Sequence, residues 1–433
     1  MRILWTSPHC RPDWMDRLGQ ESQGGQTVVM NQLSHALTRA DPVLWVDIFT
    51  RFQADDPYSD PPIQFLDGDP RVRIIRLPCG PEDNYLRKEF LYGAPIAEFA
   101  DYIVALARRE GARYDLLHGH YADGWETVTL LKERLSNHPP VLLTTHSLGR
   151  RKLADALERK EGSRERLEQR YNFQARIASE ERSLSRAERV LPLSTPEAEF
   201  LQAHYDAVSP HDLRLNIVPN GIDPQAFPLP APDVRAATRA ELGVGAEDFL
   251  LLVPSRVDPR KGQETLLRAL GTVREQVARQ PFRLLFLAWP DLPTAYATRL
   301  ERVIGEVGID ERVLKHPPVP HSRMPAFFAA ADGVVLPSQE YFSIAMLEAM
   351  LMERPLIASV HSSGRDVIED GEHGWLVDHN DLAALGAAVV RLLEMPASAR
   401  QRVGRQARER VLGFYTWDQI AGRLLGIYYP LAR

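Results

Sequence analysis

The chain has 433 residues, of which 52 are Lys or Arg and 58 are Asp or Glu, so its net charge is −6. Its 44% hydrophobic and 25% charged residues are typical of globular domains, and the length is enough for two or three of them. The mild acidity argues against a nucleic-acid partner, because proteins that bind phosphate backbones concentrate positive charge.

The two cysteines, Cys10 and Cys79, are too few for a disulfide framework or a four-ligand zinc site, which favours a reducing compartment. The apolar run at the amino terminus is too short for a signal-peptide core, and no run approaches the ~18 apolar residues of a membrane span. We therefore expect an unprocessed cytoplasmic protein with no membrane partner. The sequence does not indicate an oligomeric state.

Short apolar runs alternate with helical patterns along the first half of the chain. The predicted strands cover residues 3–7, 43–49, 72–77, 115–120, 141–146, 189–194 and 215–220. Two helical faces between them should enter the core: Val29, Leu33, Ala36 and Leu37 on one, and Phe99, Ile103 and Ala107 on the other. The alternation predicts a parallel sheet wound by helices.

Prolines at 224, 228, 230 and 232 interrupt this alternation and predict an extended linker, which we place at residues 226–245. A second series of predicted strands follows, at residues 249–255, 283–289, 312–319, 333–338, 355–360 and 374–378. We expect an α/β fold of two Rossmann-like domains, 1–225 and 246–410, that face a cleft. A closing helix at 411–433 should pack back on the first domain. Ligands of such folds bind at the carboxyl ends of the strands.

The segment SRVDPRKG (255–262) follows a buried-looking strand and precedes a helical run. Backbone amides and the helix dipole favour anions at such a helix start. Arg256 as a planar fork and Lys261 as a point charge could clamp a diphosphate there. The alternative is a solvated basic turn.

The segment PSQEYFSIAMLEAM (337–350) places Glu340 at a strand end and Glu348 within the following helix. Two carboxylates could accept hydrogen bonds from sugar hydroxyls, and the amides near Phe342 and Ser343 could face phosphate oxygens. Glu348 lies in so apolar a stretch that we expect it to be partly buried and paired. The alternative makes Glu340 a helix cap and Glu348 a surface charge.

Three segments of the first half also carry candidate ligand-binding residues. Gly24 and Gly25 precede a helix that begins near Gln26, so that backbone amides there could approach an anionic or hydroxyl-rich ligand. Two further segments, THSLGRRK (145–152) and RIASEERSL (176–184), bring His146, Lys152 and Arg176 as candidates for an anionic ligand. His118 and His120 share a strand face, but no recognisable metal-ligand set accompanies them, and we predict no metal site.

Taken together, these segments resemble the retaining, nucleotide-sugar-dependent glycosyltransferases of the GT-B fold, of the group 1 or family 4 type. The resemblance is carried by the glycine pair, by SRVDPRKG, and by Glu340 and Glu348 with Phe342 between them. It extends from the first predicted strand to at least residue 380. Four segments are specifically similar to sucrose-phosphate synthases: residues 80–103, 118–125 (HGHYADGW), 145–153 (THSLGRRKL) and 176–184.

The resemblance implies UDP-glucose as donor and fructose 6-phosphate as acceptor, giving sucrose 6-phosphate and UDP. It implies these catalytic residues: His146, Arg256, Lys261 and Glu340. It implies these donor residues: Gly25, Arg256, Lys261, Phe342, Ser343 and Glu348, the last on the ribose. It implies these acceptor residues: Gly25, Gln26, Lys88, His146, Lys152 and Arg176, whose cations would meet the phosphate. No metal or other cofactor is expected to be essential.

The chain departs from the sucrose-phosphate synthase pattern in ways that leave the acceptor open. Ala175 precedes Arg176 where two adjacent arginines are usual, Ser22 and Gln23 replace an acidic residue and a threonine, and Tyr341 and Ser343 flank Phe342 in place of proline and glycine. The alternative is a sucrose synthase-like or other nucleotide-sugar-dependent transferase with a different sugar or sugar-phosphate acceptor. A bilobal binding protein would share the two lobes but would not need a diphosphate clamp.

Overall fold

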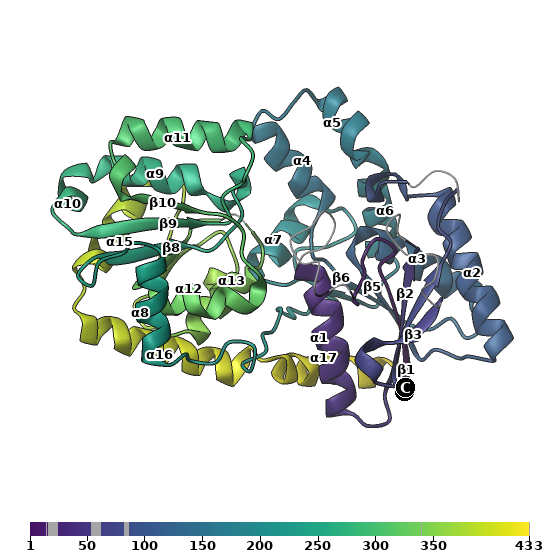
Figure 1. Ribbon diagram of the computed structural model, residues 1–433. Helices are drawn as coiled ribbons and strands as arrows, with labels where there is room; N and C mark the ends of the chain where they lie inside the picture. Colours follow the sequence, from purple (N-terminus) through teal and green to yellow (C-terminus); the bar gives the residue numbers. More distant parts are fainter. Residues whose placement is uncertain (14, 16–24, 53–61, 82–85, 339, 433) are drawn as a thin grey trace. The chain divides into compact units, whose positions relative to one another are not determined.

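The computed structural model describes residues 1–13, 15, 25–52, 62–81, 86–338 and 340–432 (Figure 1). The chain divides into two compact units. Unit 1 comprises Met1–Leu193, Glu197–Pro219 and Trp417–Arg433, and unit 2 comprises Ser194–Pro196 and Asn220–Thr416.

The described residues of unit 1 form a seven-stranded sheet in the order β3-β4-β2-β1-β5-β6-β7. The strands are β1 (Arg2–Thr6), β2 (Trp45–Arg51), β3 (Ile63–Phe65), β4 (Val72–Leu77), β5 (Leu116–His120), β6 (Val141–Thr144) and β7 (Arg189–Leu191). The pairs are parallel except β3 with β4 at the edge. Strands β1, β5 and β6 are almost wholly buried, as expected for a sheet covered by helices on both faces.

The helices of unit 1 cover this sheet. They are α1 (Gly25–Ala40), η2 (Leu66–Gly68), η3 (Lys88–Phe90), α2 (Ala94–Glu110), α3 (Tyr121–Arg134), α4 (Gly149–Glu158), α5 (Arg164–Tyr171), α6 (Phe173–Leu184), α7 (Thr195–His204) and α17 (Trp417–Leu431). The apolar faces predicted for α1 and α2 are buried, which confirms both helical patterns. Helix α17 packs beside α1, and its Tyr428 hydroxyl accepts a hydrogen bond from the Trp5 indole at 3.1 Å (Figure 1).

Unit 2 contains a six-stranded sheet in the order β10-β9-β8-β11-β12-β13, with parallel pairs throughout its described strands. The strands are β8 (Phe249–Val253), β9 (Phe282–Leu287), β10 (Val313–His316), β11 (Gly333–Leu336), β12 (Leu356–Ser359) and β13 (Trp375–Val377). The helices are α8 (Pro232–Glu241), η4 (Pro259–Lys261), α9 (Gln263–Thr272), α10 (Arg274–Ala278), α11 (Ala295–Val307), η5 (Asp310–Arg312), η6 (His321–Arg323), α12 (Met324–Ala330), α13 (Ile344–Leu351), α14 (Gly364–Val367), α15 (Leu382–Glu394) and α16 (Ala397–Phe414). Two apolar clusters, one on each face of the sheet, form its core.

Two expectations differ from the structure in unit 1. Residues 215–220 form only an isolated bridge, from Leu215 to Val190, although the Asn216 amide donates to the Val190 carbonyl at 3.0 Å. Pro192 lies opposite this segment and has no N–H to continue the ladder. Strand β3 was not predicted, because its three residues stand between turn-forming residues.

The range 226–245, predicted as a linker, contains helix α8. Proline is tolerated in the first turn of a helix, where Pro232 stands, because those amides have no intrahelical partner. Arg239 of α8 donates to the Ala330 carbonyl and to the Asp332 carboxylate, both at 3.0 Å, which anchors the helix within unit 2. The predicted boundary at residue 410 falls inside α16, which continues to Phe414.

Among the described residues, no single helix has the length and apolar character needed to cross a membrane. Helices α15 and α16 meet that criterion only when taken together, and a bend of 112° separates them. Each helix buries one apolar face in unit 2, although Leu412 and Phe414 of α16 are exposed.

Candidate functional site

Each sheet has one topological switch point, where successive strands stop being added on one side of the first strand and continue on its other side. In unit 1 this point lies between β1 and β5, and in unit 2 it lies between β8 and β11. Loops that follow the carboxyl ends of such strands diverge and leave room for ligands. Some candidate residues of each unit lie in these loops, and others lie on the helices that follow neighbouring strands.

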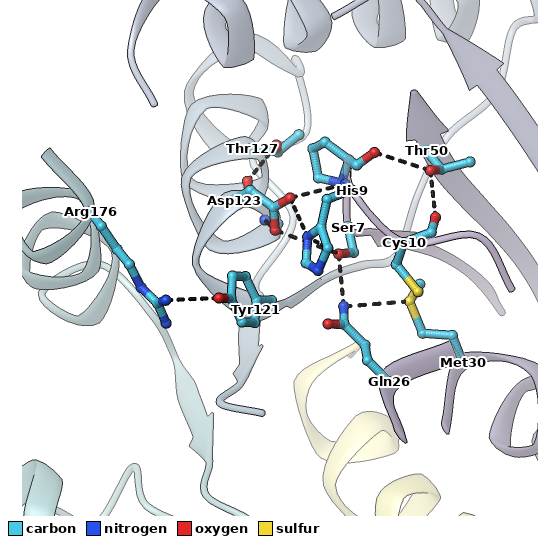
Figure 2. A network of polar contacts seen from close by, with 12 residues as sticks. Ser7, His9, Cys10, Gln26, Met30, Thr50, Tyr121, Asp123, Thr127 and Arg176 are labelled. Atoms are coloured by element: carbon cyan, nitrogen blue, oxygen red, sulfur yellow. Dashed lines mark hydrogen bonds and ion pairs between the residues drawn. The ribbon is translucent and has the colours of Figure 1, made fainter. Parts of the chain in front are cut away.

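In unit 1, three cations surround the phenol of Tyr121, the first residue of α3. Figure 2 shows one of them, Arg176, pointing at the Tyr121 hydroxyl. Its hydroxyl accepts hydrogen bonds from Arg176 Nη1 at 2.7 Å and from Lys152 Nζ at 2.9 Å. The Lys88 ammonium lies 5.8 Å from the centre of the ring. These cations come from α6, α4 and η3 respectively, so the fold brings together three residues predicted for the acceptor phosphate.

The electrostatics of this cluster, which we call the Tyr121 cluster (Tyr121, Lys88, Lys152 and Arg176), follow from its burial and charge. Burial raises the pKa of Tyr121, but the charges of Arg176, Lys152 and Lys88 outweigh it and bring the pKa to about 7. Burial also lowers the pKa of Lys152 to about 8. The positive charges of Arg176 and Lys88 lower this pKa further, whereas Tyr121 raises it. The cluster therefore gathers three cations around one phenol, and the buried carboxylate of Glu180 pairs with one of them, Arg176, at 2.8 Å.

Two residues at this edge of the sheet have backbone conformations that are rare for bulky side chains. Tyr121 has a φ of 67° and His146 a φ of 50°. Such left-handed residues are costly and concentrate at functional sites. The first turn of α3 is also pressed against β1, because a Cβ on Gly124 would lie 2.2 Å from the Thr6 carbonyl oxygen.

A second polar network in unit 1 links the loop after β1 to α3 and α1 (Figure 2). His9 Nδ1 lies 2.7 Å from Asp123 Oδ2, and the His9 amide donates to the same oxygen at 3.0 Å. Burial lowers the pKa of His9, while His9 and the Gly124 amide lower that of Asp123 against the effect of its burial. We infer that a neutral His9 donates through Nδ1 to an ionised Asp123.

Gln26 of α1 joins this network by donating from Nε2 to Ser7 Oγ at 2.7 Å. Gly25, one residue earlier, is the exposed first residue of α1. Ser22, Gln23 and Gly24 were part of the predicted motif and lie outside the described residues. The network therefore connects one predicted acceptor residue, Gln26, to His9 and Asp123, which were not predicted.

His146 stacks against His120 at the ends of β6 and β5, with His146 Nε2 lying 2.9 Å from His120 Nδ1. Burial lowers the pKa of His146 to about 3, so its imidazole is neutral at pH 7. His118 contacts the Tyr428 hydroxyl at 2.6 Å and Thr144 Oγ1 at 2.7 Å, which occupies both its ring nitrogens. His118 thus has a structural role in joining α17 to the sheet.

In unit 2, the predicted anion loop follows β8. Asp258 caps the short helix η4 and forms an ion pair with Arg260 at 2.8 Å. Arg256 is exposed, and its carbonyl accepts a hydrogen bond from the buried Gln263 side chain at 2.8 Å. Lys261 forms an ion pair with Glu340, which brings together two predicted catalytic residues from the loops after β8 and β11.

Gly262 explains why these two loops can approach. It has a φ of 73°, and a Cβ at this position would lie 2.4 Å from the Pro337 carbonyl oxygen. Glycine alone combines that conformation with so close a backbone contact. Gly262 therefore fixes the end of β11 beside the start of α9.

Glu348 is buried in α13 and paired, as predicted, and is not a surface charge. Its partner is His321, whose Nε2 lies 2.9 Å from Glu348 Oε1. This hydrogen bond raises the pKa of His321, against a smaller effect of burial. Ser343 is the N-cap residue of α13, while Phe342 packs against the core and Glu340 lies outside the helix. The alternative in which Glu340 caps the helix is wrong.

The comparisons with known proteins agree with this arrangement. Residues 234–410 match the family described as "Glycosyl transferases group 1", and residues 23–226 match "Glycosyltransferase Family 4". The D-inositol 3-phosphate glycosyltransferase of Xylanimonas cellulosilytica is 31% identical over 433 residues, covering 99% of this chain and 96% of that protein. Its namesake from Corynebacterium efficiens is 27% identical over 429 residues, covering 99% and 95%.

A solved structure, the sucrose-phosphate synthase of Thermosynechococcus elongatus, superposes with a TM-score of 0.76 at 27% identity and covers 100% of this chain and 99% of that one. The two α/β units, each built on a mainly parallel sheet, thus have the GT-B fold. The chain belongs to the group 1 glycosyltransferases, with a family 4 amino-terminal half.

Proposed function

We propose that this glycosyltransferase moves a hexosyl group from a nucleoside diphosphate sugar, UDP-glucose in the first instance, to a phosphorylated polyol or sugar. The Tyr121 cluster carries the proposal, because three cations around one phenol form a site for a dianionic ester. Charge-assisted hydrogen bonds to phosphate oxygens are among the strongest that proteins make. An acceptor without a phosphate would leave these cations poorly matched.

For the donor, we propose that Arg256 and Lys261 bind the diphosphate and that Glu348 accepts hydrogen bonds from the ribose. The departing diphosphate gains negative charge in the transition state. Fixed cations and the backbone amides at the start of α13 would stabilise that charge, and each hydrogen-bond donor would contribute about 3 kcal/mol. Glu340, now paired with Lys261, would exchange that partner for the hexose hydroxyls. His146, as a neutral imidazole, would hydrogen-bond the hexose near the reacting carbon.

We further propose that the reaction retains the anomeric configuration. The acceptor hydroxyl would attack from the face that the diphosphate leaves, and a departing phosphate oxygen would take the acceptor proton. Cations supply the charge stabilisation, so we propose that transfer needs no metal. A chelator should then leave the turnover unchanged, whereas loss with EDTA and recovery with Mg²⁺ would contradict this point.

For the acceptor, the similarity to D-inositol 3-phosphate glycosyltransferases favours inositol 3-phosphate over fructose 6-phosphate, the acceptor implied by the sequence motifs. Fructose 6-phosphate is the second candidate, supported by the likeness to sucrose-phosphate synthase. Both acceptors are phosphate esters of polyhydroxylated compounds, so the Tyr121 cluster suits either. The alternative of a different phosphorylated acceptor, raised by the sequence departures, therefore becomes the main proposal.

The test is a matrix of nucleotide sugars against acceptors, with products identified by mass spectrometry. UDP-glucose and ADP-glucose should each be offered with inositol 3-phosphate, fructose 6-phosphate, free inositol and free fructose. We expect a product with one of the phosphate esters and none with the free compounds. Transfer to free fructose at the same rate would overturn the phosphate assignment, and binding without any transfer would favour a sugar-binding protein.

A further inference from the structure

A group of metal-ligating side chains lies in unit 2 outside the residues assigned to transfer. Strands β12 and β13 are parallel neighbours, and Ser359 is the register partner of Val377. The residues that follow these two strands therefore emerge side by side. They include His361 after β12, and Asp378 and His379 directly after β13.

The ligand atoms of these three side chains all lie within 4.8 Å of one another. His361 Nε2 is 3.1 Å from Asp378 Oδ1. The rings of His361 and His379 lie edge to face, with their centres 5.3 Å apart. Among the described residues, no other group of three or more His, Cys, Asp or Glu side chains converges in this way. Two imidazoles and one carboxylate are the donor set of many zinc sites.

The surroundings hold two of these groups in position. The buried hydroxyl of Ser359 lies 2.9 Å from His379 Nδ1 and accepts a hydrogen bond from the His361 amide at 3.1 Å. In metal sites, a ligating histidine usually engages its other ring nitrogen in this way, which fixes the ring orientation. The Asn380 amide donates to Asp378 at 2.9 Å, and this bond lowers the pKa of the carboxyl group.

We propose that His361, Asp378 and His379 bind a borderline transition-metal ion of the Zn²⁺ class, with water completing the coordination. Tetrahedral zinc with bonds of about 2.0 to 2.1 Å needs ligand atoms about 3.3 Å apart. His361 Nε2 and Asp378 Oδ1 are already 3.1 Å apart, and the three ligand atoms lie within 4.8 Å of one another, so the side chains must adjust around the ion. The His361 and Asp378 side chains are 49% and 47% exposed and have room to do so. Mg²⁺ is a poor match, because it prefers oxygen ligands.

The ion would join the loops after β12 and β13. It would act on the stability of unit 2 and not on the transfer reaction, since none of its ligands belongs to the proposed donor or acceptor residues. This inference is independent of the proposed function.

The experiment uses the full-length protein, freed of any histidine tag and dialysed against a chelator. We expect one equivalent of Zn²⁺ to bind in calorimetry and to raise the melting temperature, and Co²⁺ to give the visible absorption of a low-coordinate site. His361→Ala and Asp378→Asn should each weaken Zn²⁺ binding at least tenfold, with turnover unchanged.

His35→Ala is the matched control, because His35 forms a comparable pair with Asp67 at 3.0 Å. It should bind Zn²⁺ as the wild type does. The proposal is overturned if the wild type shows neither the calorimetric nor the Co²⁺ signal. It is equally overturned if His361→Ala binds Zn²⁺ as tightly as the wild type, or if His35→Ala loses the binding.

Discussion

The hydroxyl of Tyr121 accepts a hydrogen bond from the guanidinium of Arg176 at 2.7 Å, although 55 positions separate the two residues. The Lys152 ammonium donates to the same oxygen. A phosphate group entering this cluster would compete with the phenol for both cations. The protonation of Tyr121 and Lys152 should therefore control how well a phosphorylated acceptor binds.

The first prediction is that the KM for the phosphorylated acceptor rises with pH. Tyr121 becomes an anion above a pKa of about 7, and Lys152 becomes neutral above about 8, so each step removes one positive charge from the cluster. The ester stays dianionic here, because its second pKa is near 6. We expect the acceptor KM to rise at least about tenfold from pH 7 to 9, since a proton linked to binding changes affinity tenfold per pH unit.

Steady-state kinetics over this range, with the donor KM measured in parallel, check the expectation. The nearby His9 and Asp123 should not contribute, because each has a pKa lowered from an ordinary value that is already below pH 7. An acceptor KM that stays flat, or one that rises only in step with the donor KM, would show that the cluster does not bind the phosphate.

The second prediction is that Lys152→Ala raises the acceptor KM and leaves kcat and the donor KM nearly unchanged. A phosphate contact made equally in the ground and transition states changes KM alone. A charge-assisted hydrogen bond contributes about 1.5 to 3 kcal/mol, which corresponds to roughly ten- to a hundredfold. Lys132→Ala, which removes a lysine paired with Glu188 on the same unit, is the control and should change neither KM.

How far the sequence predicts this site depends on whether neighbouring or distant residues build it. The strand ends that carry Lys261 and Glu340 follow from apolar runs, and their parallel order places both loops at one edge of the sheet. Lys88, Lys152 and Arg176 were assigned by their resemblance to a family. Their meeting around one phenol depends on the packing of η3, α4 and α6, which no local pattern encodes.

The residues that the sequence did not reveal are those whose roles depend on distant partners. Tyr121 lies within a quoted motif, but its φ of 67° is set by the junction of β5 and α3. His9 and Asp123 lie 114 positions apart, and His321, the unpredicted partner of Glu348, lies in η6, 27 positions before it. The weak signals available were a histidine three residues after the end of β1 and an aspartate in the first turn of a buried helix.

The third prediction is that Lys261→Ala lowers kcat far more than it lowers stability. A cation on the leaving diphosphate acts mainly in the transition state, and losing one such donor costs about a hundred- to a thousandfold. The Lys261 pair with Glu340 is partly exposed, so its loss should change the free energy of unfolding by less than about 1 kcal/mol.

Arg260→Ala is the control, because Arg260 lies next to Lys261 but pairs with Asp258. It should retain most of the wild-type kcat. Equal losses of kcat in the two variants would indicate a general effect on the loop, and an unchanged kcat in folded Lys261→Ala would exclude the diphosphate contact.

The last prediction concerns Gly262, which joins the start of α9 to the end of β11. In Gly262→Ala the new Cβ meets the Pro337 carbonyl oxygen at 2.4 Å, and the backbone must also hold a left-handed conformation. The conformation costs about 1 kcal/mol and a forced contact in a packed region typically 1 to 3 kcal/mol, so we expect a loss of about 2 to 4 kcal/mol. Gly371→Ala separates the two effects, because Gly371 has a φ of 83° but nothing within 4 Å of the added Cβ. That variant should lose only about 1 kcal/mol in denaturant unfolding. If the two variants lose the same free energy of unfolding, the close approach of Gly262 to Pro337 does not hold together the loops that carry Lys261 and Glu340.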